Sequence, residues 1–183
     1  MENIRILALS GSLRKISYNT AAIQALRELA PVHVEVVVYN TLGNLPLFNP
    51  DLEGEMIPAF ESLKKAVGKS DGLIIASPEY AHGISGVLKN GLDWLVSGEE
   101  FVSMPIMLLN TSPRATHAQA ALREVITTMS GNIVEKACVS IPLLGSGLNC
   151  EGILNHTEIS ASLASGLDEF CVAIKNLELN KRM

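Results

Sequence analysis

Short apolar runs alternate with longer amphipathic segments along most of the chain, and this alternation limits the possible folds more than any other feature. Runs rich in β-branched and aliphatic residues predict strands at residues 4–9, 32–39, 72–77, 105–110 and 134–141. Helical spacing of apolar residues predicts helices at about 19–29, 57–68, 84–96, 117–130 and 160–176. Strands and helices therefore follow one another in strict alternation.

Strands that are apolar on both faces, each followed by a helix long enough to cross over, require a parallel sheet between two layers of helices. We therefore expect one α/β domain over residues 1–183, a flavodoxin-like three-layer sandwich with a five-stranded parallel sheet in the order 2-1-3-4-5. In this order a ligand binds at the carboxyl ends of strands 1 and 3, where the winding direction reverses. Gly43–Glu55, rich in Asn, Pro and Gly, is expected to be a long surface loop.

Composition excludes several functional classes. The chain is 48% hydrophobic, and its 19 acidic and 14 basic residues include no Lys/Arg block, so neither a nucleic acid nor a membrane surface is expected as a partner. No apolar stretch approaches the roughly 20 residues that a membrane helix needs. Three widely spaced cysteines and the absence of a signal-peptide pattern favour a cytoplasmic location.

The loop after the first predicted strand carries hydroxyl groups and two cations at the start of a helix. It reads Ser10-Gly11-Ser12-Leu13-Arg14-Lys15-Ile16-Ser17-Tyr18-Asn19-Thr20. A helix N-terminus presents unpaired N–H groups and the positive end of its dipole, so this loop is typical of a phosphate site. An ordinary turn capped by Ser17 or Asn19 is the alternative. The Walker and Gly-x-Gly-x-x-Gly patterns are missing, which disfavours ATP and a Rossmann-type dinucleotide.

The loop after the third predicted strand adds a more specific signal. It reads Ser77-Pro78-Glu79-Tyr80-Ala81-His82-Gly83 and leads to Leu88-Lys89-Asn90-Gly91-Leu92-Asp93-Trp94. Together with Gly11-Ser12-Leu13-Arg14 and Ser17-Tyr18-Asn19, it resembles the NADPH-dependent FMN reductase family, which includes chromate, quinone and azo-dye reductases. The family motifs run Gly-Ser-Leu-Arg-x-x-Ser-x-Asn and Pro-Glu-Tyr-Asn-x-x-x-Pro-Gly-x-Leu-Lys-Asn-x-x-Asp-Trp.

The resemblance implies a non-covalent FMN and either NADPH or NADH as electron donor. The phosphate is then expected at the first loop and the isoalloxazine ring against Pro78–Gly83. The expected cofactor-binding residues are Ser10, Ser12, Arg14, Ser17, Tyr18, Asn19, Thr20, Pro78, Glu79, Tyr80, Ala81, His82, Gly83 and Ser112. Ala81 stands where the family has Asn, and Ser85 where it has Pro. His82 either replaces the lost polar contact or faces solvent.

The loop after the fourth predicted strand has two possible roles, and the helix that carries Trp94 has an expected role in assembly. Ser112 and Arg114, in the loop after the fourth strand, either border the flavin or the incoming nicotinamide cofactor, or form a surface turn. In the family, the helix that carries Lys89, Asp93 and Trp94 packs between subunits, so these residues are expected to serve assembly in a homodimer or homotetramer. Residues 145–156 receive no role.

The function expected from the resemblance is an FMN-dependent NAD(P)H oxidoreductase. Hydride passes from NAD(P)H to FMN and then to a quinone, azo compound, metal oxyanion or free flavin, and no side chain is assigned as a catalytic acid, base or metal ligand. The alternative is a flavodoxin-type electron-transfer protein without NAD(P)H activity, although a net charge of -5 provides no dense acidic face. A hydrolase using Ser85, His82 and Glu79 is disfavoured because no Gly-x-Ser-x-Gly elbow is present.

Overall fold

The computed structural model describes residues 3–181 of the chain. The strands are β1 Ile4–Ser10, β2 Val34–Tyr39, β3 Gly72–Ala76, β4 Glu79–Tyr80, β5 Gly83–Ile84, β6 Pro105–Asn110, β7 Asn132–Ile133 and β8 Val139–Ser140. The α-helices are α1 Tyr18–Leu29, α2 Pro58–Gly68, α3 Gly86–Leu95, α4 Thr116–Thr128, α5 Cys150–Leu154 and α6 Thr157–Lys181. Three short 3-10 turns lie at Leu42–Asn44, Pro50–Leu52 and Glu135–Ala137.

The main sheet is parallel throughout. Its order is β2-β1-β3-β6-β7, and β8 also pairs with β6. When β6 is counted as the fourth strand and β7 with β8 as the fifth, the order is 2-1-3-4-5, so the flavodoxin-like prediction is confirmed. The winding direction reverses between β1 and β3.

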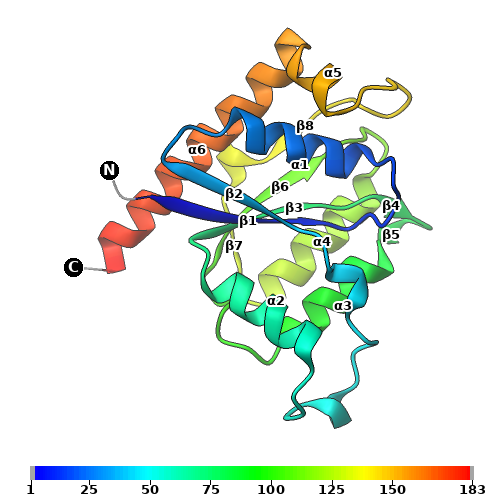
Figure 1. Cartoon of the computed structure of the whole chain (residues 1–183), viewed down its shortest axis with the longest axis vertical. Helices are drawn as coiled ribbons and strands as arrows, with labels where there is room; N and C mark the ends of the chain where they lie inside the picture. The colour runs from blue at the N-terminus through cyan, green and yellow to red at the C-terminus, as the bar shows by residue number, and fades with distance from the viewer. Residues whose placement is uncertain (1–2, 182–183) are drawn as a thin grey trace.

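Strand β1 illustrates why these segments form a sheet covered on both faces. Ile6 and Ala8 belong to an apolar cluster that includes residues of α1, α5 and α6. Leu7 and Leu9 belong to a second cluster with residues of α2, α3 and α4. Because successive strand residues point to opposite faces, each strand contributes to both clusters. The result is a sheet between two helix layers (Figure 1).

The fifth predicted strand, residues 134–141, forms only as two short pieces. β7 pairs with the beginning of β6 and β8 with its end, and the 3-10 turn Glu135–Ala137 lies between them. Glu135 and Lys136 are charged and exposed, so they interrupt the apolar pattern that a continuous buried strand requires. Glu135 instead forms an ion pair with Arg123 of α4.

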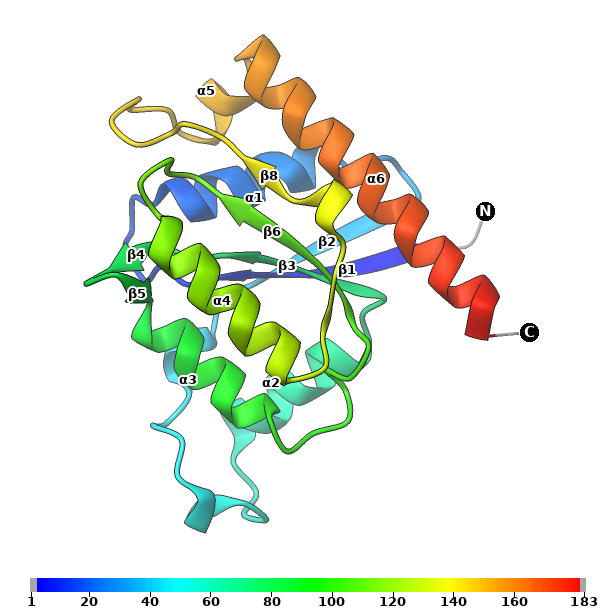
Figure 2. The ribbon, with the colours of Figure 1, turned by 180° about the vertical axis from the view of Figure 1, so that it is seen from behind.

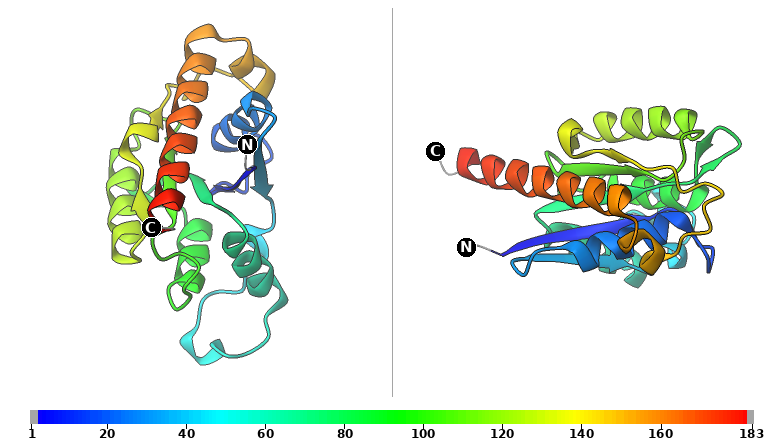
Figure 3. Two further views of the ribbon diagram at one scale, coloured as in Figure 1. Left: turned by 90° about the vertical axis from the view of Figure 1, so that its left-hand side faces the viewer. Right: turned by 90° about the horizontal axis from the view of Figure 1, so that it is seen from above.

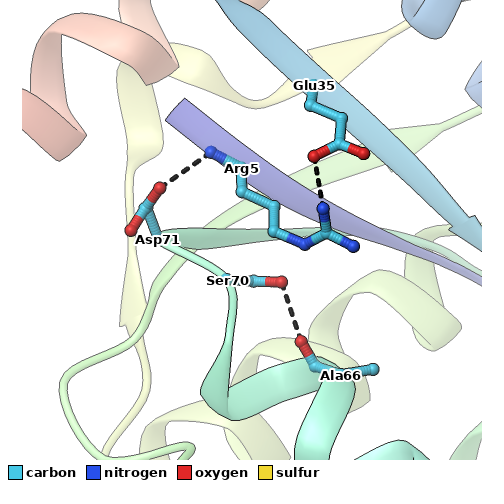
Figure 4. Close-up of polar contacts among 5 residues, drawn as sticks. All are labelled: Arg5, Glu35, Ala66, Ser70 and Asp71. Atoms are coloured by element: carbon cyan, nitrogen blue, oxygen red, sulfur yellow. Dashed lines mark hydrogen bonds and ion pairs between the residues drawn. The ribbon is translucent and has the colours of Figure 1, made fainter. Parts of the chain in front are cut away.

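Polar contacts join β1, β2 and β3 at the amino ends of the strands. Asp71 Oδ2 accepts the backbone N–H of Arg5 at 2.7 Å, and the Arg5 guanidinium forms an ion pair with Glu35 of β2 (Figure 4). Ser70 Oγ donates to the Ala66 carbonyl at 2.8 Å and so closes the end of α2. These contacts stabilise the end of the sheet opposite the loops discussed below.

The loops after β1, β3 and β6 meet at the carboxyl edge of the sheet, near β4 and β5 (Figure 2). The start of β1 and the end of α6 lie at the other end of the molecule (Figure 3). Within residues 3–181, no helix combines the length and the apolar character needed to cross a membrane.

Candidate functional site

A cavity of about 280 Å³ opens at the carboxyl ends of β1, β3 and β6, beside the point where the strand order reverses. This volume is near the lower end of the range of roughly 300–1,000 Å³ that small-molecule sites occupy. The cavity is lined by Ser12, Arg14, Tyr18, Asn19, Ser77, Pro78, Glu79, Tyr80, Thr111, Ser112, Arg114, Ala115 and Leu144. The position is the one that the strand order predicts for a ligand.

Helix α1 begins beside this cavity, and Ser17 caps it. The Ser17 Oγ accepts the backbone N–H of Thr20 at 3.3 Å, so the cap is Ser17 and not Asn19. One capping side chain satisfies only one of the free N–H groups of the first turn, which leaves the others able to bind an anion. Arg14 is exposed, lines the cavity and forms no ion pair within residues 3–181.

Buried hydrogen bonds fix the start of α1 against the neighbouring loops. Thr111 Oγ1 donates to Asn19 Oδ1 at 3.1 Å, and both residues are buried. The hydroxyl oxygens of Ser10 and Thr20 are 2.9 Å apart. Because the Asn19 side-chain oxygen already accepts a hydrogen bond, the side-chain NH₂ group is the part that can donate to a ligand in the cavity.

The first loop approaches the start of α3 so closely that only glycine fits at position 11. A Cβ on Gly11 would lie 2.7 Å from Ser85 Oγ and 3.2 Å from Leu88 Cβ. The Ser85 hydroxyl accepts the N–H of Leu88 and caps α3, while the Ser77 hydroxyl donates to the Pro78 carbonyl at 3.0 Å. The first loop is therefore packed closely against Ser85 and Leu88 at the start of α3.

The loop after β3 forms a short antiparallel hairpin. β4 and β5 are joined by Ala81 and His82, whose φ angles are +48° and +59°. A two-residue turn with both central residues at positive φ is of type I′, which favours Asn and Gly. A left-handed conformation costs a residue with a Cβ about 1–2 kcal/mol. The family's Asn tolerates this conformation better than Ala81 does.

Glu79 links this hairpin to α4. Its Oε2 accepts the backbone N–H of Ala118 at 2.8 Å, and its Oε1 lies 3.2 Å from His82 Nδ1. The hydrogen bond from Ala118 is the main reason why the pKa of Glu79 lies below its usual value of 4.5, and the contact with His82 lowers it further. Desolvation acts in the opposite direction. The His82 ring also meets the His117 ring edge-on, with centroids 4.5 Å apart.

The loop after β6 repeats a feature of the first loop. Ser112 Oγ accepts the backbone N–H of Arg114 at 3.3 Å, and Ser12 Oγ accepts that of Arg14 at 3.4 Å. Both Ser-x-Arg turns line the cavity, and Arg114 also forms no ion pair within residues 3–181. The cavity therefore has two guanidinium groups available to anionic ligands.

The segment after β8 contributes Leu144 to the lining of the cavity, and Leu144 is 52% exposed. Residues 145–156, for which the sequence predicts no role, follow Leu144 outside the lining. The Gly147 N–H donates to the Tyr18 hydroxyl at 3.0 Å, which attaches this segment to α1. Gly145 and Gly147 have φ angles of +82° and +73°, so the backbone at this contact and two residues before it favours glycine.

The expected cofactor-binding residues fall into three groups. Those that line the cavity are Ser12, Arg14, Tyr18, Asn19, Pro78, Glu79, Tyr80 and Ser112. Ser10, Ser17 and Thr20 support the first loop through hydrogen bonds, whereas Ala81, His82 and Gly83 form the hairpin end outside the lining. The lining residues absent from the expected set are Ser77, Thr111, Arg114, Ala115 and Leu144. Ser77 and Thr111 directly follow β3 and β6, and this position at the carboxyl end of a parallel strand is the sequence signal that could have identified them.

The expectation that Trp94 serves assembly requires correction. Trp94 is only 1% exposed because the chain's own loop covers it. Its indole N–H donates to the Pro46 carbonyl at 2.9 Å, and its ring contacts Phe48 and Phe60 with centroids 5.2 and 5.0 Å away. Trp94 therefore fixes the 43–55 loop to the body of the protein. Most residues of this loop are exposed, as the surface-loop prediction expects, whereas Leu45 is buried.

The polar residues beside Trp94 also have partners within the chain. Lys89 and Asp93 form an ion pair one turn apart on α3, which is the ordinary arrangement on an exposed helix face. The Asn90 side chain accepts the Phe48 N–H at 2.8 Å and donates to the Pro46 carbonyl at 2.9 Å. This face of α3 is therefore occupied largely by contacts inside one chain.

Comparison with known proteins agrees with this architecture. A sequence model described as NADPH-dependent FMN reductase matches residues 4–143. An NAD(P)H-dependent FMN reductase of Pseudomonas aeruginosa is 31% identical over 159 residues, which are 84% of this chain and 85% of that protein. A quinone reductase of Escherichia coli is 29% identical over 142 residues, covering 74% of this chain and 76% of that protein.

Among solved structures, a flavoenzyme NAD(P)H:(acceptor) oxidoreductase from Paracoccus denitrificans superposes with a TM-score of 0.80. The superposition covers 94% of this chain and 98% of that one, at 24% sequence identity. At this identity the likeness supports the fold.

Proposed function

Since this chain belongs to the NADPH-dependent FMN reductase family, we propose that it is an FMN-containing oxidoreductase that uses NAD(P)H to reduce quinone-type acceptors. The observation that carries the proposal is the position of one cavity at the reversal of the strand order. The cavity lies between the start of α1, which suits an anion, and the hairpin of residues 79–84, called the Tyr80 hairpin below. Relatives named for FMN and quinone reduction support the same chemistry.

The residues present fit FMN. The N-terminus of α1 and the Arg14 guanidinium supply donors for a phosphate dianion, and the amide of Asn19 adds a neutral donor on the same side. Elsewhere in the lining, Pro78, Tyr80 and Leu144 supply apolar surface. A planar ring with a phosphate tail suits a cavity that offers both guanidinium groups and apolar side chains.

When bound, FMN supplies the two-electron chemistry that joins a hydride donor to an acceptor. The protein's own contribution is binding and orientation. Arg14 and the first turn of α1 hold the phosphate, and Pro78, Glu79 and Tyr80 form the part of the lining that meets the ring. Arg114, on the loop after β6, binds a phosphate of the nicotinamide donor, a role supported by its position in the cavity lining.

The rim of the cavity favours a planar, weakly polar acceptor. Tyr80 and Leu144 both line the cavity and are each 52% exposed. Side chains of this type contact an aromatic ring through dispersion and burial of apolar surface. A quinone fits such a rim better than a strongly hydrated metal oxyanion does.

A matched pair of arginine variants tests the proposal. We expect Arg14→Gln to raise the Kd for FMN by about 10- to 150-fold, which corresponds to one lost charge-assisted hydrogen bond. We expect Arg114→Gln to leave that Kd within about twofold and to raise the KM for NADPH or NADH instead. Fluorescence titration and steady-state rates with a benzoquinone measure both effects.

Anaerobic addition of NADPH or NADH to the yellow protein separates this proposal from an electron-transfer flavodoxin. Loss of the visible flavin absorbance supports an NAD(P)H oxidoreductase. Wild-type protein that takes up no FMN, or whose flavin keeps its colour with both donors, contradicts it.

Three remaining expectations stay predictions. These are one domain over residues 1–183, a homodimer or homotetramer, and a cytoplasmic location, which agrees with three free cysteines. Light scattering coupled to size exclusion measures the oligomeric state, and a monomer at micromolar concentration would contradict it.

A further inference from the structure

The Tyr80 hairpin, defined as residues 79–84, is held in a conformation that its sequence does not favour. Both turn residues, Ala81 and His82, carry a Cβ and have positive φ angles. Such a turn persists only where the surrounding structure determines it through other contacts. Among the hydrogen bonds of residues 3–181, the side-chain bond that joins this hairpin to another element is made by Glu79, which accepts the Ala118 N–H.

Both carboxylate oxygens of Glu79 are engaged, although the residue lines the cavity. Oε2 accepts the Ala118 N–H at 2.8 Å, and Oε1 contacts the His82 ring at 3.2 Å, within the turn itself. The side chain is only 15% exposed. One carboxylate thus connects the beginning of the hairpin, its turn and the start of α4.

The charge of Glu79 suits the helix that it contacts. Ala118 lies in the first turn of α4, where backbone N–H groups are unpaired and the dipole is positive. That first turn has no acidic residue, and the α4 N-cap residue, Ala115, makes no side-chain cap hydrogen bond. Glu79 therefore supplies from another element the anion that an N-terminal turn usually obtains from its own sequence.

We propose that Glu79 is a positioning residue that holds the strained Tyr80 hairpin against α4 and so fixes the wall of the cavity that meets the flavin ring. The inference rests on the proposed function for the identity of the ligand. The contact also couples the hairpin to the loop that carries Ser112 and Arg114, because this loop leads directly into α4. The two loops then form one rigid wall of the cavity.

Glu79→Gln tests the proposal because the amide oxygen can still accept the Ala118 N–H, while the negative charge is lost. We expect amide hydrogen exchange of residues 80–84 in the flavin-free protein to become about fivefold to tenfold faster. We expect the Kd for FMN to rise about fivefold. The visible circular dichroism of bound FMN at saturation should also change, since it reports the surroundings of the ring.

Glu124→Gln is the matched control. It removes a carboxylate charge from an exposed position on α4, the helix that Glu79 contacts, and Glu124 lies outside the cavity lining. Hydrogen exchange in the hairpin, the Kd for FMN and the circular dichroism should all equal those of the wild type.

Rescue by Ala81→Gly separates positioning from a general structural role. Glycine removes the strain at φ +48°, so the double variant with Glu79→Gln should recover at least half of the lost hairpin protection and FMN affinity. Ala81→Gly alone should make the hairpin exchange no faster than in the wild type. Where Glu79→Gln alone fails to fold, the double variant carries the test: it should fold because the turn strain is removed, and its failure to fold overturns the proposal.

Two outcomes overturn the proposal: hairpin exchange in Glu79→Gln equal to that of the wild type, or loosening that Ala81→Gly does not reverse. If the wild-type protein takes up no FMN, the proposed function fails, whereas the exchange experiment on the flavin-free protein still decides the role of Glu79.

Discussion

Replacing Gly11 by alanine tests how tightly the first loop is packed against the start of α3. The new Cβ would lie 2.7 Å from Ser85 Oγ, 3.2 Å from Leu88 Cβ and 3.3 Å from Ser77 Oγ. The Ser85 hydroxyl cannot move freely, because it caps α3 through the Leu88 N–H. Leu88 Cβ is attached directly to the helix backbone, so the first loop itself must shift.

We expect Gly11→Ala to lower the free energy of unfolding by about 1–3 kcal/mol, the usual cost of adding a methyl group to a packed interior. For a protein of this size, each kcal/mol lowers the Tm by about 2–4 °C. The displaced loop carries Ser12 and Arg14, so FMN affinity should fall as well. Thermal unfolding of the flavin-free protein and a fluorescence titration with FMN measure the two effects.

Gly86→Ala is the control for this experiment. Gly86 is the first residue of α3, and a Cβ there would meet nothing within 4 Å. Both substitutions restrict the unfolded chain equally, so their difference isolates the steric clash at Gly11. We expect Gly86→Ala to be more stable than Gly11→Ala by about 1.5–4 kcal/mol. Equal stability and equal FMN affinity of the two variants would refute the reasoning.

Three further predictions concern stability. Because the pKa of Glu79 is lowered in the folded protein, its carboxylate stabilises the fold above pH 4.5, and this stabilisation is lost as the pH falls through the pKa of the folded state. Denaturant titrations should therefore show a steeper loss of stability below pH 4.5 in the wild type than in Glu79→Gln. His82 and His117 are the titratable groups that face the carboxylate. Ser17→Ala removes the α1 cap and should cost about 0.5–2 kcal/mol in urea unfolding. Trp94→Phe removes the hydrogen bond to Pro46 and should expose the 43–55 loop to limited proteolysis, and an unchanged cleavage rate would contradict the anchoring role.

The pattern of apolar residues was sufficient to predict the four long strands and the helices that separate them. β6 and α2 illustrate this, since their observed bounds agree with the predicted ones to within one residue. The sequence could predict that the loop after β1 borders the cavity because its chemistry is local: hydroxyl groups and Arg14 directly precede the start of α1. These features depend on neighbours in the sequence, so they can be read from it.

The hairpin, the buried Trp94 and the wall formed by Leu144 depend on contacts between distant segments. Ala81 is not a residue that a type I′ turn favours, and the hairpin contacts Ala118, 39 residues further along the chain, through Glu79. Trp94 is amphipathic and suits an interface as well as a core, and only the path of the 43–55 loop decides between them.

The sequence by itself therefore determined the layered parallel fold, the edge at which the cavity opens and the hydroxyl and guanidinium groups of its first loop. The tertiary structure decided which residues enclose the ring side, because that side is assembled from β3, β6 and the segment after β8. Periodicity and helix capping arise from residues a few positions apart, whereas a cavity wall arises from side chains that only the folded backbone brings together.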